Sequence, residues 1–295
     1  RLSLVGSEMC IRDRYEIVMV NDGSGDNSWQ VMQELRGMDS NIHLISLSRN
    51  FGSHAAILCG LSHCTGDLAA VKAADLQEPT ELILQMVERW KEGNRVVLAV
   101  RKARNEPLKQ TFFSGLYYKI VRKCALNNMP QGGFDVYLLD RKVITVLTNL
   151  DERNSALTGQ ILWSGFKTDI VYYTRLAREV GTSRWTLRKK IRLVMDTLFS
   201  FSSLPITIVL GVGVFSMAIA IIWAMIVLIA KITGYINVSG WTTLFIFNLF
   251  SFGIIMMTLG ILGEYLWRTF DASRNRPPYI IEEDIQQERK EDDLS

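Results

Sequence analysis

The chain of 295 residues has few side chains that could cross-link it or bind a soft metal ion, with four cysteines and three histidines. The cysteines show no paired framework and no secretory signal is evident, so we expect no disulfides and a reducing compartment. Cysteine and histidine come together in one helical pattern that lacks a Cys-x-x-Cys pair, which argues against zinc. The four cysteines are Cys10, Cys59, Cys64 and Cys124. The helical pattern contains Cys59 and Cys64 together with His54 and His63.

Two segments lack charged side chains altogether, residues 206–230 and residues 241–262. At about 1.5 Å per residue they would form helices of roughly 37 and 33 Å, enough to cross a hydrocarbon core of about 30 Å. Residues 231–240 between them carry one positive charge, whereas basic residues gather before the first segment and after the second. By the positive-inside rule, we predict a multi-pass protein of the cytoplasmic (inner) membrane, with both termini and the preceding domain in the cytoplasm.

We therefore expect a hairpin of two transmembrane helices over residues 204–267. Residues 185–203 before it combine basic side chains with an apolar stripe at near-helical spacing, which predicts an interfacial helix. Residues 268–295 after it form a cytoplasmic tail, and we expect its charged part from residue 282 onward to be disordered. Because hairpin anchors commonly associate with one another, a homo-oligomer is a further expectation.

The first fourteen residues, RLSLVGSEMCIRDR, show no clear helix or strand period. They resemble the translation of a sequencing adapter, so we expect residues 1–14 to be a non-native leader that replaces a first strand and helix. A short natural terminus without order is the alternative.

From residue 15 onward, short apolar strand patterns alternate with helix patterns. This βαβ rhythm predicts an α/β fold, with a Rossmann-like, mostly parallel sheet covered on both faces. The expected strands are residues 16–20, 42–47, 67–73 and 96–100, and the expected helices are residues 28–37, 54–63 and 81–92.

Two acidic loops follow expected strands, at the edge of the sheet where open α/β folds bind ligands. In the first loop, Asp22 can accept hydrogen bonds from a base or ribose, and Gly23 lets the backbone approach a ligand closely. In the second loop, Asp75 and Gln77 offer oxygen ligands that suit Mg²⁺ or Mn²⁺ together with a diphosphate. One such turn is usually structural, but two in one sheet favour a binding site.

Several motifs, in order, resemble those of family 2 glycosyltransferases of the GT-A fold. The likeness is to the branch that acts on polyprenyl phosphates, which includes dolichyl-phosphate mannose synthases, and it covers residues 15–281. It implies a GT-A catalytic domain at residues 15–184 that passes one sugar from a UDP- or GDP-linked donor to a polyprenyl (undecaprenyl) phosphate. The motifs are VNDGSGDNS (20–28), SRNFG (48–52), ADLQEP (74–79), GGFD (132–135), LLDR (138–141), Arg178-Glu179 with residues 181–185, GEYLWR (263–268) and RPPYII (276–281).

The resemblance also implies roles for single residues. The nucleotide-sugar ligands would be Asp22, Gly23, Arg49 and Asp75, and the ligands of a Mg²⁺ or Mn²⁺ ion would be Asp75 and Gln77. Asp135 would be the catalytic residue and would orient the acceptor or the metal. Arginine forks match phosphate bidentately, so the candidates for the acceptor phosphate are Arg101, Arg104, Arg153, Arg178 and Arg184.

The chain departs from the family pattern at Ala73, which stands where the family usually has the first carboxylate of Asp-x-Asp. This loss motivates an alternative hypothesis, a non-catalytic pseudoenzyme subunit. Another alternative is a family 2 enzyme with a different acceptor, such as a polysaccharide or a lipid headgroup. The basic residues beside Tyr117 and Tyr118 fit a solvated or membrane-facing helix better than a nucleic-acid site, so we expect no nucleic-acid partner.

Overall fold

The structure is a computed structural model. It describes residues 15–74, 77–101, 121–123, 125–150, 152, 156–174, 196–197, 199–202, 204–233 and 240–286. The chain divides into two compact units, one of residues Arg1–Thr197 with Arg276–Ser295 and the other of residues Leu198–Asn275. The expected leader, residues 1–14, and most of the expected interfacial helix lie outside the described residues.

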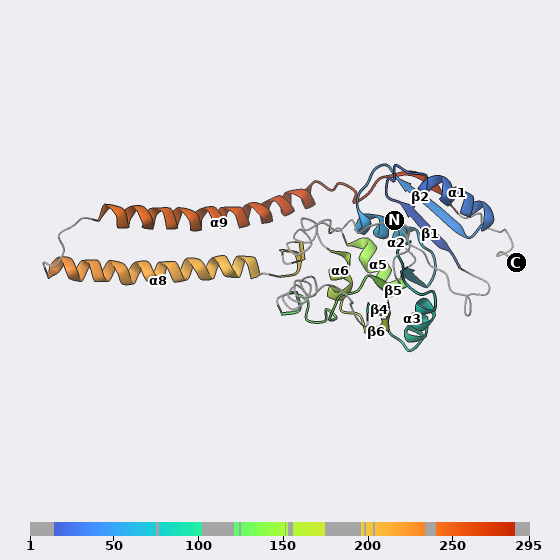
Figure 1. Cartoon of the computed structure of the whole chain (residues 1–295), viewed down its shortest axis with the longest axis horizontal. Coiled ribbons are helices and arrows are strands. Elements are labelled where there is room, and N and C mark those ends of the chain that lie inside the picture. Colours follow the sequence, from blue (N-terminus) through green and yellow to red (C-terminus); the bar gives the residue numbers. More distant parts are fainter. Residues whose placement is uncertain are drawn as a thin grey trace. The chain divides into compact units, whose positions relative to one another are not determined.

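The first sheet of the larger unit has the strand order β1-β2-β7 (Figure 1). Strands β1 (Ile17–Asn21) and β2 (Ile42–Leu47) are parallel, and β7 (Ile281–Ile285) is antiparallel to β2. Alternate residues of β1 and β2 pack against α2 (Ser53–His63) on one face and against α1 (Ser28–Met38) on the other. Burial on both faces explains why these strands are mostly apolar.

The second sheet has the order β3-β5-β4-β6. Its strands are β3 (Leu68–Val71), β5 (Val136–Asp140), β4 (Val96–Arg101) and β6 (Thr168–Tyr173). Helix α3 (Glu81–Lys91) covers one face through its apolar side, while α5 (Arg141–Asn149) contacts β3 and β5. Helix α6 (Leu157–Trp163) packs against α5.

The α/β architecture is confirmed, but the sheets are mixed and not mostly parallel. Of the five described strand pairings, β1 with β2 and β4 with β6 are parallel, whereas the other three are antiparallel. The two strands that run against their neighbours, β5 and β7, follow long segments without a predicted strand. An apolar strand pattern has the same period in either direction, so it does not carry the pairing direction.

The expectation of disorder from residue 282 onward is wrong for the start of that segment, because residues 281–285 form β7. The strand pairs with β2 from Leu44 opposite Ile285 to Leu47 opposite Ile281. Beside this ladder, the His43 Nε2 atom lies 2.6 Å from the Asp284 Oδ1 atom. Backbone hydrogen bonds and this contact between His43 and Asp284 stabilise a segment that is otherwise rich in charge.

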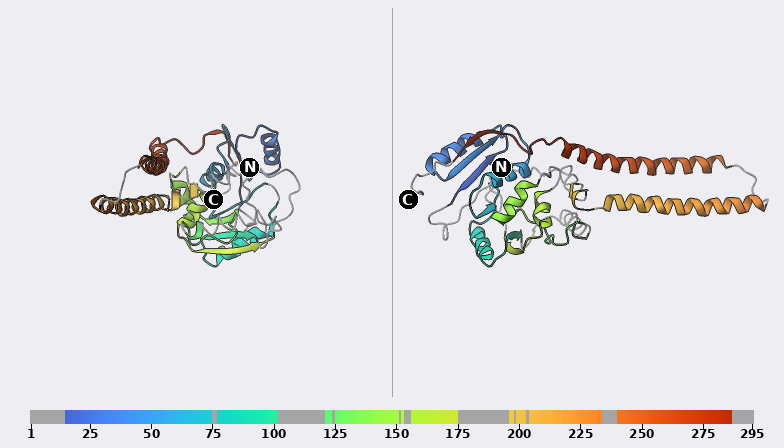
Figure 2. Two further views of the ribbon diagram at one scale, coloured as in Figure 1. Left: turned by 60° about the vertical axis from the view of Figure 1, so that its left-hand side comes forward. Right: turned by 180° about the vertical axis from the view of Figure 1, so that it is seen from behind.

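The smaller unit contains two long helices, α8 (Leu204–Ile232) and α9 (Trp241–Ser273). They contact each other and run side by side in each view (Figure 2). Both expose large apolar side chains along their length, and segments Leu204–Trp223 and Phe250–Ser273 are long and apolar enough to cross a membrane. These helices confirm the two apolar helices expected from the sequence and indicate association with a membrane.

Candidate functional site

The loop after β1 is held against the loop after β2 by the Asp22 carboxylate. Asp22 is 5% exposed. Its Oδ1 atom accepts a hydrogen bond from the backbone N–H of Phe51 (N···O 2.7 Å), and its Oδ2 atom accepts one from Gly52 (3.0 Å). The Asn50 side chain donates to the Asp22 carbonyl oxygen at 3.0 Å. Asp22 thus organises the start of α2, and its predicted contact with a nucleotide stays a prediction.

Gly23 is packed directly against the second loop. Its φ of +61° lies in the left-handed region, and an added Cβ would lie 2.4 Å from the carbonyl carbon of Arg49. A residue with a side chain therefore does not fit here without moving the backbone. The sequence predicted that Gly23 lets a ligand approach the backbone closely. In the structure, the loop that contains Arg49 makes this close approach.

Arg49 projects from the same pair of loops and is exposed. Its guanidinium carbon lies 4.1 Å from the centre of the Phe51 ring, so the cation stacks on an aromatic face. Stacking restricts the long side chain and holds one positive charge beside the Asp22 loop. Such a charge suits the phosphates of a nucleotide, as the sequence predicted for Arg49.

The structure joins Arg101 and Asp135, two candidates for which the resemblance implied separate roles. Arg101 ends β4 and Asp135 directly precedes β5, and the antiparallel register places Ala99 opposite Val136. An Arg101 Nη2 atom forms an ion pair with Asp135 Oδ2. The Arg101 side chain is 15% exposed, whereas that of Asp135 is 62% exposed. A solvent-accessible carboxylate thus lies beside a largely covered cation, at the end of β4 and the start of β5.

The other acidic residue of the resembling segment, Asp140, has a structural role at the opposite end of β5. It caps α5 by accepting a hydrogen bond from the Lys142 N–H at 3.0 Å. It also accepts one from Trp90 Nε1 and pairs with Arg95, each at 2.9 Å. Burial alone would raise the pKa of Asp140, but these hydrogen bonds and the Arg95 charge outweigh it and lower that pKa.

The described residues do not form a metal site. Among them, no three His, Cys, Asp or Glu side chains could jointly hold an ion. Ala73 and Ala74 are exposed after β3 and offer no ligating side chain, while Gln77 is buried.

Five predicted site residues lie outside the described residues, and their roles stay predictions. They are Asp75, Arg104, Arg153, Arg178 and Arg184.

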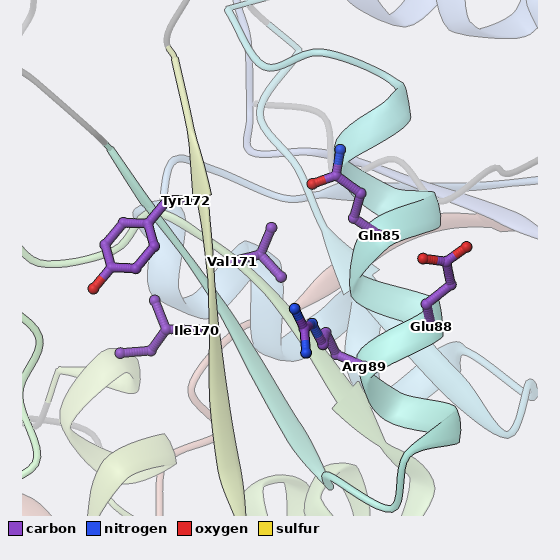
Figure 3. A pocket seen from close by; sticks show the side chains of 6 residues that line it. All are labelled: Gln85, Glu88, Arg89, Ile170, Val171 and Tyr172. Carbon is purple, nitrogen blue, oxygen red and sulfur yellow. The ribbon is translucent and has the colours of Figure 1, made fainter.

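A hollow of about 410 Å³ lies between α3 and β6. Gln85, Glu88 and Arg89 border it from the helix (Figure 3). On the strand, Val171 points toward the helix, whereas the Tyr172 side chain points to the other side of β6 (Figure 3). The lining side chains therefore do not converge on one point, and none of the predicted site residues is among them.

Comparison with known proteins shows the family of the chain. Residues 5–147 match the family model described as glycosyl transferase family 2. The chain is 35% identical to the glycosyltransferase YkcC of Bacillus subtilis (strain 168), over 95% of this chain and 87% of that protein. It is 34% identical to the prophage bactoprenol glucosyl transferase homolog of Escherichia coli (strain K12), over 90% of this chain and 87% of that protein.

A bactoprenol glucosyl transferase from a phage is similar to the chain as well. The chain is 32% identical to the bactoprenol glucosyl transferase of Shigella phage SfV, over 92% of this chain and 89% of that protein. These relatives match nearly end to end, including the two apolar helices. The chain belongs to glycosyltransferase family 2.

Proposed function

We propose that the chain transfers a single sugar from a nucleotide-sugar donor to a polyprenyl phosphate at the cytoplasmic face of a membrane. The observation that carries this proposal is the joining of a family 2 catalytic domain to two exposed apolar helices in one chain. The relatives named bactoprenol glucosyl transferase support it, because their similarity extends over both parts. A lipid acceptor explains why a sugar-transferring domain needs such helices.

The acceptor phosphate is the nucleophile in this proposal. A phosphate monoester has a second pKa of about 6, so most of it is a dianion at neutral pH and needs little help from a base. An in-line attack of one phosphate oxygen on the anomeric carbon forms the new C–O bond as the bond to the nucleotide diphosphate breaks. The anomeric centre is inverted, and positioning supplies most of the catalysis.

Arg101 positions that phosphate, and Asp135 orients the donor sugar. On binding, the phosphate takes the place of the Asp135 carboxylate at the Arg101 guanidinium, because a dianion competes well for a bidentate donor. Asp135, released from the pair, is then able to accept a hydrogen bond from the donor sugar. Its exposure supports this exchange, since a carboxylate in contact with solvent can move away at little cost.

The donor binds across the loops that follow β1 and β2. Gly23 and Arg49 line this region, and the stacked Arg49 cation faces the nucleotide phosphates. The donor carries UDP or GDP. A requirement for Mg²⁺ or Mn²⁺, held through Asp75 and Gln77, stays a prediction.

The test is a transfer assay with the full chain in lipid nanodiscs. Radiolabelled UDP- and GDP-sugars are offered with undecaprenyl phosphate or, as the control, with undecaprenol, which lacks the phosphate. We expect a labelled lipid with the phosphate and none with the alcohol. Equal labelling of both lipids, or of an added polysaccharide in their place, would contradict the proposal.

The missing carboxylate at Ala73 favours one second candidate, a pseudoenzyme that binds the donor without turnover. Calorimetric titration with the nucleotide diphosphates separates the two. Binding of a nucleotide, together with no lipid product from any donor, would support the pseudoenzyme.

A further inference from the structure

Tyr173, the last residue of β6, is a buried tyrosine whose hydroxyl has no clear structural purpose. The residue is 5% exposed and belongs to the core cluster between the second sheet and α3. Its Oη atom is buried and has no hydrogen-bond partner within the part of the chain that the structure describes. Its ring alone would pack equally well as phenylalanine.

A buried hydroxyl without a partner carries an energetic penalty. It has lost its hydrogen bonds to water and has gained none from the protein, which destabilises the folded chain. Such groups are rare in folded proteins, and each one needs an explanation such as a ligand. The position of Tyr173 points to the explanation.

Tyr173 lies beside Arg101 in the sheet. In the parallel pairing of β4 with β6, Arg101 is the register partner of Tyr173. Both also continue rows that face α3, because Val171 on β6 and Ala99 on β4 belong to the cluster packed on that helix. Side chains two residues apart on a strand share a face, so the tyrosine and the arginine lie on the same side of the sheet.

Another candidate group lies at this end of the sheet. Asp135 pairs with Arg101 there. Tyr173 therefore lies at the carboxyl ends of β4 and β6, beside the strand residue, Arg101, that forms the pair with Asp135. Open α/β sheets bind their ligands at such ends.

We infer that the Tyr173 hydroxyl donates a hydrogen bond to a phosphate oxygen of the substrate that Arg101 holds. The hydroxyl and the guanidinium then bind one phosphate from adjacent strands. The inference rests on the proposed function and adds a substrate-binding residue to it.

The test replaces Tyr173 by phenylalanine in the full chain, with Tyr172→Phe as the matched control. Tyr172 is the neighbouring residue, is 55% exposed and points to the other side of β6 (Figure 3). KM and kcat are measured separately for polyprenyl phosphate and for the nucleotide sugar, and thermal unfolding is followed for each variant.

We expect Tyr173→Phe to raise KM for polyprenyl phosphate about 10-fold or more, the loss typical of a hydrogen bond to a charged group. KM for the nucleotide sugar should change less, because Arg101 holds the lipid phosphate in the proposed function. The unfolding temperature should stay the same or increase, since an unpartnered hydroxyl is removed.

Two results would overturn the inference. One is that Tyr173→Phe has unchanged KM values for both substrates while the parent chain turns over normally. The other is a lower unfolding temperature for Tyr173→Phe than for Tyr172→Phe, which would show that the hydroxyl has a partner within the protein. If the parent chain itself makes no lipid product, the proposed function fails. The role of the Tyr173 hydroxyl is then still tested by direct binding titrations of both variants with nucleotide diphosphate and with lipid phosphate.

Discussion

At the scale of single residues, the described site is built from contacts between loops distant in sequence. Asp22 accepts hydrogen bonds from the loop of residues 48–52, and Gly23 packs closely against the same loop because it has no side chain. The sequence identified both residues, since an acidic glycine turn after a strand is a recognisable pattern. It could not identify their partners, because those contacts depend on the parallel pairing of β1 with β2.

Gly23→Ala should destabilise the larger unit. A Cβ at this position meets backbone atoms, and φ of +61° disfavours any side chain. We expect the free energy of unfolding to fall by at least about 1 kcal/mol, measured by thermal or urea unfolding. The matched control is Gly25→Ala in the same loop, where an added Cβ meets nothing within 4 Å. Equal stability of the two variants would contradict the packing described for Gly23.

Arg101→Lys should weaken acceptor binding without loss of the fold. Lysine keeps the positive charge but has no planar fork to hold a phosphate with two hydrogen bonds. We expect KM for polyprenyl phosphate to rise about 10-fold and kcat to change less. Arg89→Lys on the exposed surface of α3 is the control and should leave KM unchanged. The assignment of Arg101 fails if both variants have the KM of the parent chain.

At the scale of elements, β7 links the end of the chain to the first sheet. It covers the outer edge of β2 with a backbone ladder, and Ser62 on α2 shares a hydrogen bond of 2.7 Å with the Tyr279 hydroxyl just before the strand. Local patterns predicted strand β2 at its observed bounds and α3 to within one residue. They missed β7, because its sequence IEEDI has a charged centre and is ordered by the partner strand.

The pairing of β7 should depend on pH through Asp284. Burial alone would raise the pKa of Asp284, but the hydrogen bond from His43 and the nearby histidines outweigh it and hold that pKa below its usual range. A lowered pKa adds stability that is fully present above the unfolded value of about 3.9 and is lost as pH falls through the folded value.

Thermal unfolding of Asp284→Asn against the parent chain tests this dependence. We expect the variant to unfold at a lower temperature above about pH 5, and the difference to shrink steadily below about pH 4. Glu283→Gln, at the exposed neighbouring position, should show a smaller difference. A difference for Asp284→Asn that is constant from pH 3 to pH 7 would contradict the role given to its charge.

At the scale of the whole molecule, the chain combines an enzyme domain with a pair of membrane-length helices. The sequence predicted both helices because charge is absent over their length. The charge-free run ends at residue 262 and the predicted hairpin at residue 267, whereas α9 continues to Ser273. Glu264 and Arg268 pair one turn apart in this part of the helix, with Arg268 Nε 2.9 Å from Glu264 Oε1, so their charges support the helix.

The basic flanks of this hairpin predict its orientation. Cysteine labelling tests this orientation. In a chain with Cys10 and Cys124 replaced by serine, one variant carries Asn237→Cys, between the helices, and another carries Ser295→Cys. Burial raises the pKa of the Cys59 thiol to about 12 and also raises that of Cys64, so both native thiols react slowly. We expect a membrane-impermeant maleimide to label Asn237→Cys in intact cells and Ser295→Cys after lysis. The reverse pattern would contradict the proposed orientation.

In the proposed reaction, the phosphate of a membrane lipid attacks the sugar beside Arg101 and Asp135. Mass spectrometry of the lipid product, made by the full chain from undecaprenyl phosphate and a nucleotide sugar, tests this step. We expect a lipid that carries one phosphate and one sugar, formed by the parent chain and strongly reduced in Asp135→Asn. A lipid with a chain of sugars or with a sugar diphosphate, or an equal yield from Asp135→Asn, would contradict it.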